Sequence, residues 1–352
     1  MSSKESMSLV IRPDYFSGGR TLQRETTQIP SPEVNEALVK VLYAAQNPTD
    51  VQSFDSKAVG EGGVLGCDFV GTVEQVGAKV TRLQTGDTVA GLIWGGETKG
   101  KGAFSHYTVA DEEISFKVPD NISLEQAATV PLAATTAWLA LFSSDCLNIP
   151  RKSSPITSVL IWGGNSSVGR YAIQIAAMYN FDIITTCSTR HFDAVKALGA
   201  KHVFDYRDEK VVEKIKQAGP HLRYVFDTIG NETSSATGSQ AIAEATGQPG
   251  ALCTVRPGKA NTEGVNKGTK VTDVLVWTAF LKEHRYGDFY WPPNKDDHEL
   301  CKEFFDKLPK YLQEDKLKPN VPKLMLGLDA VQQGFQEYRD GKISGYKVVY
   351  KL

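Results

Sequence analysis

The spacing of hydrophobic and polar positions changes near residue 158, and the change separates two kinds of predicted structure. Before that point, Gly and Pro separate short apolar runs at 37–42, 71–76, 88–92 and 104–109. Short runs bounded by turn residues are typical of β-strands. The first 120 or so residues therefore predict a compact, mostly β domain.

After residue 158, short segments rich in β-branched residues alternate with amphipathic segments of helical length. The predicted strands are Val159–Trp162, Ile183–Cys187, His202–Asp205, Tyr224–Asp227 and Leu252–Val255. The predicted helices are Gly169–Tyr179, Phe192–Leu198, Val211–Gln217 and Ser234–Ala245. This alternation predicts a parallel, doubly wound sheet, and hence an α/β fold.

The last part of the chain predicts two helices, at about 299–313 and 329–341. A final strand is expected at Lys347–Tyr350, and it need not belong to the parallel sheet. A chain of 352 residues is too long for one ordinary core, so we expect two domains.

Composition and charge exclude several classes of function. The formal net charge of −2 offers no electrostatic basis for binding nucleic acid. The longest nearly apolar stretch, Val130–Phe142, is shorter than the roughly 20 residues that cross a bilayer, so no membrane span is expected. The segment Met1–Val10 lacks the apolar core of a secretory signal, and we expect a cytoplasmic protein. The five cysteines are scattered without a CxxC pair, which argues against disulfides and against a cysteine-built zinc site.

A glycine-rich turn joins the predicted strand Val159–Trp162 to the next helix. It consists of Gly163, Gly164, Asn165, Ser166, Ser167, Val168 and Gly169. Gly164 permits the tight turn, Gly169 lets the helix pack close to the strand, and the helix N-terminus offers N–H groups to a pyrophosphate. Ser166 replaces the middle glycine of the usual pattern and adds a hydroxyl that can bond phosphate. The alternative is a glycine-rich turn that binds nothing.

The end of the second predicted strand bears on which dinucleotide would bind. An NAD-specific site would place an acidic residue there, whereas this chain has Cys187, Ser188, Thr189, Arg190 and His191. Ser188 can donate a hydrogen bond, and the Arg190 guanidinium suits phosphate oxygens. We therefore expect NADPH rather than NADH, the alternative being a solvated arginine at a helix start.

Several motifs resemble a known family. They are Gly66–Val73, Gly86–Val89, Gly102–Tyr107, the turn after Trp162, and Gly341–Val349. Together they resemble the zinc-free quinone reductase and enoyl reductase branch of the medium-chain dehydrogenase/reductase superfamily. Within that branch, 186–193 and 203–207 are most similar to the fungal trans-acting enoyl reductases that serve polyketide synthases.

The resemblance implies a GroES-like β-rich catalytic domain and a Rossmann domain, with the active site between them. The implied divisions are 1–125 for the first part of the catalytic domain, 126–285 for the NADPH-binding domain, and 286–352 for the return to the catalytic domain. The resemblance also places Tyr206 beside the adenosine phosphate and Asn47 near the nicotinamide. Val255 and Lys347 complete the expected cofactor contacts. A half-buried aromatic and a turn-forming amide are the structural alternatives for Tyr206 and Asn47.

Zinc-dependent relatives carry a Cys before the first helix and a His-Glu pair further on. The corresponding segments here are Asn47–Asp50 and Gly66–Asp68, in which one thiol and one carboxylate do not make a catalytic zinc site. We therefore expect no metal. Without a Lewis acid, reduction of an activated double bond is favoured over oxidation of an alcohol.

The expected catalytic residues are Thr136, Gln52 and Asn47. Relatives often have Tyr or Lys where this chain has Gln52, whose amide can donate a hydrogen bond but cannot protonate the product. We therefore hypothesise that Thr136 and Gln52 position the carbonyl while solvent supplies the α-proton.

The leading hypothesis is an NADPH-dependent enoyl reductase, monomeric or homodimeric, whose small-molecule substrate is presented on an acyl carrier protein of a polyketide synthase. A quinone or aldehyde reductase shares every motif, and the replacement at Gln52 leaves open a non-catalytic NADPH-binding protein.

Overall fold

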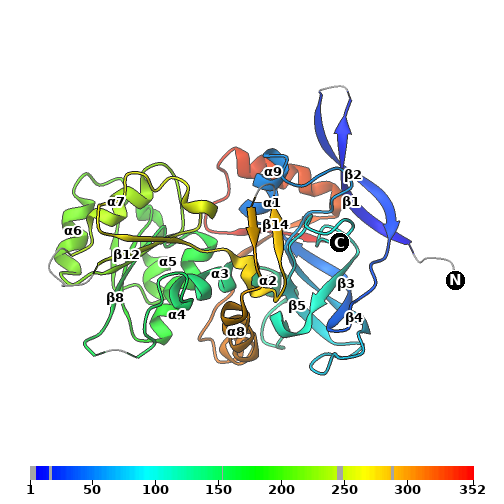
Figure 1. The fold of residues 1–352 in the computed structure, drawn as a ribbon, viewed down its shortest axis with the longest axis horizontal. Helices are drawn as coiled ribbons and strands as arrows, with labels where there is room; N and C mark the ends of the chain where they lie inside the picture. The colour runs from blue at the N-terminus through cyan, green and yellow to red at the C-terminus, as the bar shows by residue number, and fades with distance from the viewer. Residues whose placement is uncertain (1–4, 16–17, 153, 244–248, 287–288) are drawn as a thin grey trace.

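The computed structural model describes residues 5–15, 18–152, 154–243, 249–286 and 289–352, which form two lobes (Figure 1). In Figure 1 the lobe with the parallel sheet lies on the left, and the N-terminal β-structure lies on the right. Each lobe is built around its own sheet, and helices α2, α3 and α8 lie between them.

The parallel sheet has six strands in the order β10-β9-β8-β11-β12-β13. They are β8 (Ser158–Trp162), β9 (Asp182–Thr186), β10 (His202–Phe204), β11 (Tyr224–Asp227), β12 (Ala251–Thr254) and β13 (Lys270–Asp273). The first five confirm the predicted strands to within one residue at each end. The sixth, β13, was not predicted, because its four residues include a lysine and an aspartate and only Thr272 is buried.

The helices around this sheet are α4 (Ser167–Met178), α5 (Phe192–Ala197), α6 (Val211–Ala218) and α7 (Ser234–Gln240). The prediction for the last of these, Ser234–Ala245, was too long. After Gln240 the chain turns back to the segment before β11, where the Ala243 amide donates to the Leu222 carbonyl at 2.8 Å. The end of that predicted helix, 244–245, lies outside the described residues.

The second sheet has seven strands, five from the N-terminal part of the chain and two from the C-terminal part. Its strands are β3 (Glu36–Ala45), β4 (Asp68–Val76), β5 (Thr88–Leu92), β6 (Tyr107–Asp111), β7 (Ser115–Lys117), β16 (Pro322–Leu326) and β17 (Lys347–Lys351). The last strand, β17, is antiparallel to β3 and parallel to β16, so the C-terminal part of the chain returns to the first lobe. The domain boundaries given above stay a prediction.

The predicted apolar run at 104–109 is a strand only from Tyr107. Before that residue the chain leaves the ladder, and the Phe104 amide donates to the Leu65 carbonyl at 2.9 Å. Two hairpins were not predicted: β1 (Glu5–Asp14) with β2 (Gly19–Gln28), and β14 (His284–Tyr286) with β15 (Phe289–Trp291). In Figure 1 the first of these hairpins extends beyond the sheet at the upper right.

The remaining helices position the region between the lobes. They are α1 (Pro48–Asp55), α2 (Leu124–Ala128), α3 (Pro131–Phe142), α8 (Lys295–Gln313) and α9 (Val331–Arg339). Short 3-10 turns lie at Glu112–Ile114, Thr189–His191, Pro257–Lys259, Val276–Ala279 and Leu328–Ala330.

The helix α3 explains the apolar stretch seen in the sequence. All of its residues are buried, and Trp138 stacks on Phe304 of α8 with ring centroids 4.7 Å apart. Burying an apolar helix on every side removes its surface from water and stabilises the junction of the lobes. No helix of the described segments combines the length and apolar character that crossing a membrane requires.

Candidate active site

A cavity of about 690 Å³ lies between the two lobes. One wall comes from α1, α3 and β17, and the other from the turn after β8, the end of β9 and the segment after β13. The lining includes the predicted residues Asn47, Gln52, Thr136, Gly163, Asn165, Ser166, Ser167, Val168, Ser188, Arg190, Tyr206, Val255 and Lys347. The fold therefore brings most of the predicted site residues to one place.

The remaining two predicted residues, Gly164 and Gly169, lie behind the cavity wall. A Cβ on Gly169 would lie 2.3 Å from the Gly163 carbonyl oxygen, and one on Gly164 would lie 2.0 Å from the Thr185 hydroxyl. No side chain fits at either position, so the strand, turn and helix can pack this closely only with glycine. Both residues shape the turn and do not line the cavity.

Ser166 begins helix α4 as its N-cap. Its hydroxyl accepts a hydrogen bond from the Gly169 amide at 2.9 Å and lies 2.8 Å from the Thr228 hydroxyl. This hydroxyl is thus engaged within the protein, while the other N–H groups of the first turn point toward the cavity end of the helix. A helix N-terminus with such free donors favours an anionic group.

The cavity wall carries basic side chains and no acidic ones among the described residues that line it. The cations are Arg170, Arg190, Arg256 and Lys347. Arg170 donates to the side-chain oxygens of Asn165 at 3.2 Å and Asn320 at 3.1 Å, and its burial lowers its pKa. The sequence reasoning missed Arg170, although it directly follows the last glycine of the turn. A wall of this composition attracts anions.

Ser188 and Arg190, which are predicted to favour NADPH over NADH, follow strand β9. Tyr206 follows strand β10, and all three residues line the cavity. The Arg190 guanidinium donates to the Ser344 hydroxyl at 3.0 Å and to the His191 ring at 3.1 Å. Burial, and then the charge of Arg190, lower the pKa of His191. Tyr206 is 47% exposed. Ser344 was not predicted as a contact; it lies in the loop before β17, within the motif Gly341–Val349.

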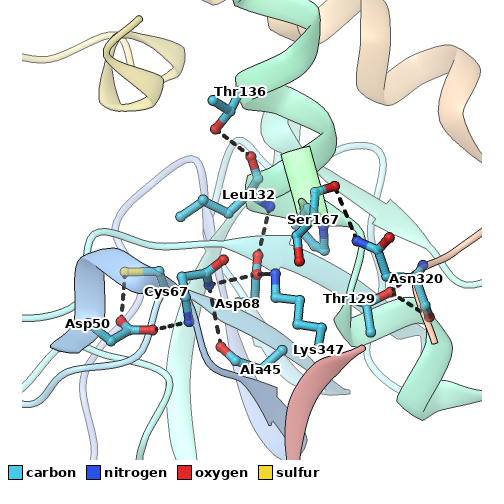
Figure 2. A network of polar contacts seen from close by, with 12 residues as sticks. Ala45, Asp50, Cys67, Asp68, Thr129, Leu132, Thr136, Ser167, Asn320 and Lys347 are labelled. Carbon is cyan, nitrogen blue, oxygen red and sulfur yellow. Dashed lines mark hydrogen bonds and ion pairs between the residues drawn. The ribbon is translucent and has the colours of Figure 1, made fainter. Parts of the chain in front are cut away.

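Asp68 organises the opposite corner of the cavity (Figure 2). Its carboxylate accepts hydrogen bonds from the Leu132 amide at 2.7 Å, the Asn47 side-chain amide at 2.9 Å and the Lys347 ammonium at 2.5 Å. All of these groups are buried or nearly so, and the ion pair is among the most buried of the described chain. Asp68 therefore fixes the orientation of Asn47 and Lys347.

The side chains at the positions of the zinc ligands do not suit a metal ion. The Cys67 thiol donates to Asp50 at 3.2 Å, and burial raises the pKa of Cys67 well above its ordinary value, so the thiol stays protonated. The Lys347 ammonium already neutralises Asp68 and would repel a dication. Among the described residues, no three His, Cys, Asp or Glu side chains are gathered to hold a metal.

The two residues predicted to hold a substrate carbonyl have other partners in this structure. Thr136 donates its hydroxyl hydrogen to the Leu132 carbonyl at 2.8 Å, within helix α3. The Gln52 amide donates to the hydroxyl of Tyr338 at 2.9 Å. Tyr338 also lines the cavity, and the sequence reasoning missed it.

Part of the cavity wall is apolar. Its apolar residues include Leu132, Val274, Leu275, Val276 and Trp277. The indole of Trp277 stacks on Trp94 of the other lobe, with ring centroids 4.7 Å apart and planes 8° from parallel. This stack holds the apolar wall in place across the junction of the lobes.

Known proteins match both lobes. The model of the alcohol dehydrogenase GroES-like domain matches residues 33–120, and the model named zinc-binding dehydrogenase matches residues 167–249. A trans-enoyl reductase of Alternaria alternata is 33% identical and covers 93% of this chain and 95% of the relative. A zinc-type alcohol dehydrogenase-like protein of Schizosaccharomyces pombe is 32% identical and covers 92% of this chain and 94% of that protein. A solved structure, an alcohol dehydrogenase superfamily protein from Novosphingobium aromaticivorans, has a TM-score of 0.80 at 21% identity and covers 99% of each chain.

The fold and the cavity define a two-lobed α/β oxidoreductase, with a GroES-like β-rich lobe and a Rossmann lobe. The chain belongs to the medium-chain dehydrogenase/reductase superfamily, in the branch of the quinone and enoyl reductases. The predicted fold class and family are confirmed. The family implies a nicotinamide cofactor. The segment that matches the zinc-binding dehydrogenase model, 167–249, contains none of Asn47, Cys67 and Asp68, so this match does not bear on the metal.

Proposed function

We propose that this protein is an NADPH-dependent reductase that transfers hydride to the activated C=C bond of an enoyl thioester or enone. The observation that carries the proposal is the cavity wall, which combines a helix N-terminus with the arginines Arg170, Arg190 and Arg256 and has no acidic residue among its described members. Three guanidinium groups together with a helix N-terminus suit a dinucleotide with a third phosphate.

Each part of the cofactor has matching residues in the wall. The first turn of α4 and Arg170 would hold the pyrophosphate, since Gly163 and 165–168 line the cavity beside them. Ser188, Arg190 and Tyr206 would hold the adenosine end with its 2′-phosphate. Asn47, Val255 and Lys347 would contact the nicotinamide end.

The reduced nicotinamide supplies the hydride, and the protein orients the acceptor. The buried ion pair of Asp68 and Lys347 keeps Asn47 in one orientation, so the cofactor end of the cavity is preorganised. The apolar wall at Leu132 and Trp277 keeps water from the reacting carbons. Gln52 and Thr136 line the cavity; the Gln52 amide would bond the carbonyl oxygen of the acceptor, and the Thr136 hydroxyl would do so on leaving the Leu132 carbonyl.

We further propose that the substrate is a polyketide intermediate on an acyl carrier protein. The support is the similarity over nearly the whole chain to a protein named trans-enoyl reductase. An acyl chain on a flexible arm also suits a cavity that has a partly apolar wall and opens between two lobes.

Turnover tests this proposal directly. NADPH oxidation would be measured with 2-enoyl thioesters, free and bound to an acyl carrier protein, and with quinones and aldehydes. We expect enoyl thioesters to be reduced with the highest kcat/KM. Preferential reduction of quinones or aldehydes would replace the proposal with the second reductase class. No oxidation with any acceptor, despite NADPH binding, would indicate a non-catalytic protein.

The assignment of Thr136 and Gln52 has its own test. Thr136→Val keeps the size of the side chain and removes the hydroxyl, and Gln52→Ala removes the amide. We expect each variant to lower kcat with the best enoyl thioester. Wild-type turnover in both variants would show that neither residue positions the substrate.

A further inference from the structure

Tyr338 of helix α9 lines the cavity, and its hydroxyl meets the Gln52 side chain of helix α1. Tyr338 is half-buried, and it lines the cavity together with Gln52. On α1, Thr49 and Gln52 are three residues apart and both face the cavity, as expected for one face of a helix. Asn47 precedes the same helix, so a single face leads from the nicotinamide corner to Tyr338.

The direction of the hydrogen bond between Gln52 and Tyr338 matters for chemistry. The Gln52 side-chain nitrogen donates to the phenolic oxygen at 2.9 Å. A phenol has one hydrogen to donate, and accepting a bond from an amide leaves that hydrogen available. Among the described residues, this accepted bond is the one hydrogen bond of the Tyr338 hydroxyl.

Other candidate proton donors in the cavity are already engaged. The Thr136 hydroxyl donates to the Leu132 carbonyl, and the Tyr346 hydroxyl donates to the Lys342 carbonyl at 3.1 Å. The Lys347 ammonium is paired with the buried carboxylate of Asp68. Thr49 of α1 also lines the cavity, but its aliphatic hydroxyl is a much weaker acid than a phenol, so Tyr338 is the better proton donor near α1.

We propose that Tyr338 is the catalytic proton donor and that Gln52 is its positioning residue. This inference rests on the proposed reduction of an enoyl thioester. Hydride adds to the β-carbon, the C=C π bond breaks, and its electron pair moves toward the carbonyl to give an enolate. The α-carbon of the enolate then takes the Tyr338 proton, the O–H bond breaks, and the phenolate left behind regains a proton from water. One hydride and one proton are consumed for each double bond reduced.

The inference revises the hypothesis that bulk solvent protonates the α-carbon. It also explains how the chain can function with glutamine at position 52, since the acidic hydrogen comes from a different helix. The competing interpretation is that Gln52 and Tyr338 only tie α1 to α9. A second pair provides the control, because Arg339 of α9 donates to Asp55 of α1 at 2.5 Å and neither residue lines the cavity.

The first experiment compares Tyr338→Phe with Asp55→Asn. General acid catalysis contributes on the order of 10²-fold to 10⁴-fold in rate, so we expect Tyr338→Phe to lose at least tenfold in kcat. The dissociation constant of NADPH should not change in either variant, and Asp55→Asn should keep wild-type kcat. Equal kcat in Tyr338→Phe and wild type would overturn the inference, as would equal losses in the two variants.

The second experiment follows the proton itself. When an α-methyl enoyl thioester is reduced in D₂O, a fixed tyrosine delivers deuterium to one face of the α-carbon. We expect wild-type enzyme to give one α-epimer and Tyr338→Phe to give a mixture, because solvent can reach both faces. An unchanged single epimer from the variant would contradict Tyr338 as the donor.

Gln52→Glu tests the positioning role with Tyr338 intact. A carboxylate would accept the phenolic hydrogen and turn it away from the substrate, whereas a protonated carboxyl could donate as the amide does. We therefore expect kcat of this variant to rise as pH falls, a dependence that wild type lacks. Parallel pH profiles would contradict the positioning role. If wild-type enzyme reduces no enoyl thioester, the proposed function itself is contradicted. If wild-type enzyme is active and Tyr338→Phe keeps its kcat, only the role of Tyr338 is contradicted.

Discussion

Asp68 is the residue on which most of the site depends. Its carboxylate has three donors from three elements: the start of α3, the residue before α1, and the first residue of β17. A buried carboxylate with this many partners is stable only while its counter-charge is present. At the scale of single residues, the orientation of Asn47 and Lys347 therefore depends on this buried carboxylate.

Removing the Lys347 ammonium should lower the free energy of unfolding. In Lys347→Met the buried carboxylate of Asp68 keeps its desolvation penalty and loses its counter-charge, which typically costs about 3–5 kcal/mol of stability. Urea unfolding would measure the loss. The double variant Asp68→Asn/Lys347→Met should recover part of it, while Lys316→Met, which breaks the exposed pair with Glu314, should cost little. Equal losses in the buried and exposed variants would contradict this account.

Asp50 gives the site a pH dependence of stability. Burial raises the pKa of Asp50 from 3.8 to about 7, so the folded protein binds this proton more tightly than the unfolded chain does. Between about pH 4 and pH 7, the free energy of unfolding should therefore fall as pH rises, by up to about 1.4 kcal/mol per unit. Below this window the contribution is fully present, and above it the contribution is lost.

The Asp50→Asn variant isolates that contribution, because every other titrating group is common to both proteins. Urea unfolding of both at several pH values should show that the advantage of wild type over the variant shrinks toward neutral pH. Parallel stability curves would mean that Asp50 does not titrate in this window.

Sequence rules could predict some site residues and not others. Ser188 and Arg190 were predictable because they directly follow a strand whose end is a known position for dinucleotide selection. Tyr338 was not, since 286 residues separate it from Gln52 and only the packing of α9 on α1 brings them together. Local patterns identify residues that one element positions, and tertiary contacts decide the rest.

At the scale of elements, the unit β8–turn–α4 positions the proposed phosphate site. The strand was predicted to within one residue because its apolar run ends at the first glycine of the turn. The strand β13 escaped prediction because a short, mostly polar edge strand has no hydrophobic pattern. Element boundaries were thus predictable where an apolar or β-branched run ends at turn residues.

The turn after β8 packs so closely on α4 that adding one methyl group at Gly169 should weaken NADPH binding. In Gly169→Ala the new Cβ would lie 2.3 Å from the Gly163 carbonyl oxygen, so the backbone of the turn must move. Overpacking of this kind costs about 1–3 kcal/mol, and NADPH affinity should fall at least tenfold. Gly238→Ala in α7 is the matched control, because its Cβ would meet the side chains of Val225 at 3.1 Å and Trp162 at 3.9 Å and no backbone atom. Calorimetry would compare NADPH binding, and similar affinities would show that the turn tolerates the shift.

At the scale of the whole molecule, the two lobes share one cavity because β17 returns to the first sheet and α3 is buried between them. The change in hydrophobic spacing near residue 158 predicted two different lobes. The resemblance to the reductase family predicted that the C-terminal segment returns to the first lobe. The buried helix α3 was seen only as an apolar stretch, since a helix buried on every side has no amphipathic pattern. The stack of Trp94 on Trp277 across the lobes could not be predicted from sequence.

The central claim is that this shared cavity binds NADPH, and isothermal titration calorimetry with NADPH and NADH tests it most directly. We predict that wild-type protein binds NADPH at least tenfold more tightly than NADH, a difference of about 1.4 kcal/mol. Arg190→Gln should weaken NADPH binding toward the NADH value and leave NADH binding unchanged. Equal affinity for the two nucleotides in wild-type protein, or no binding of NADPH, would contradict the claim.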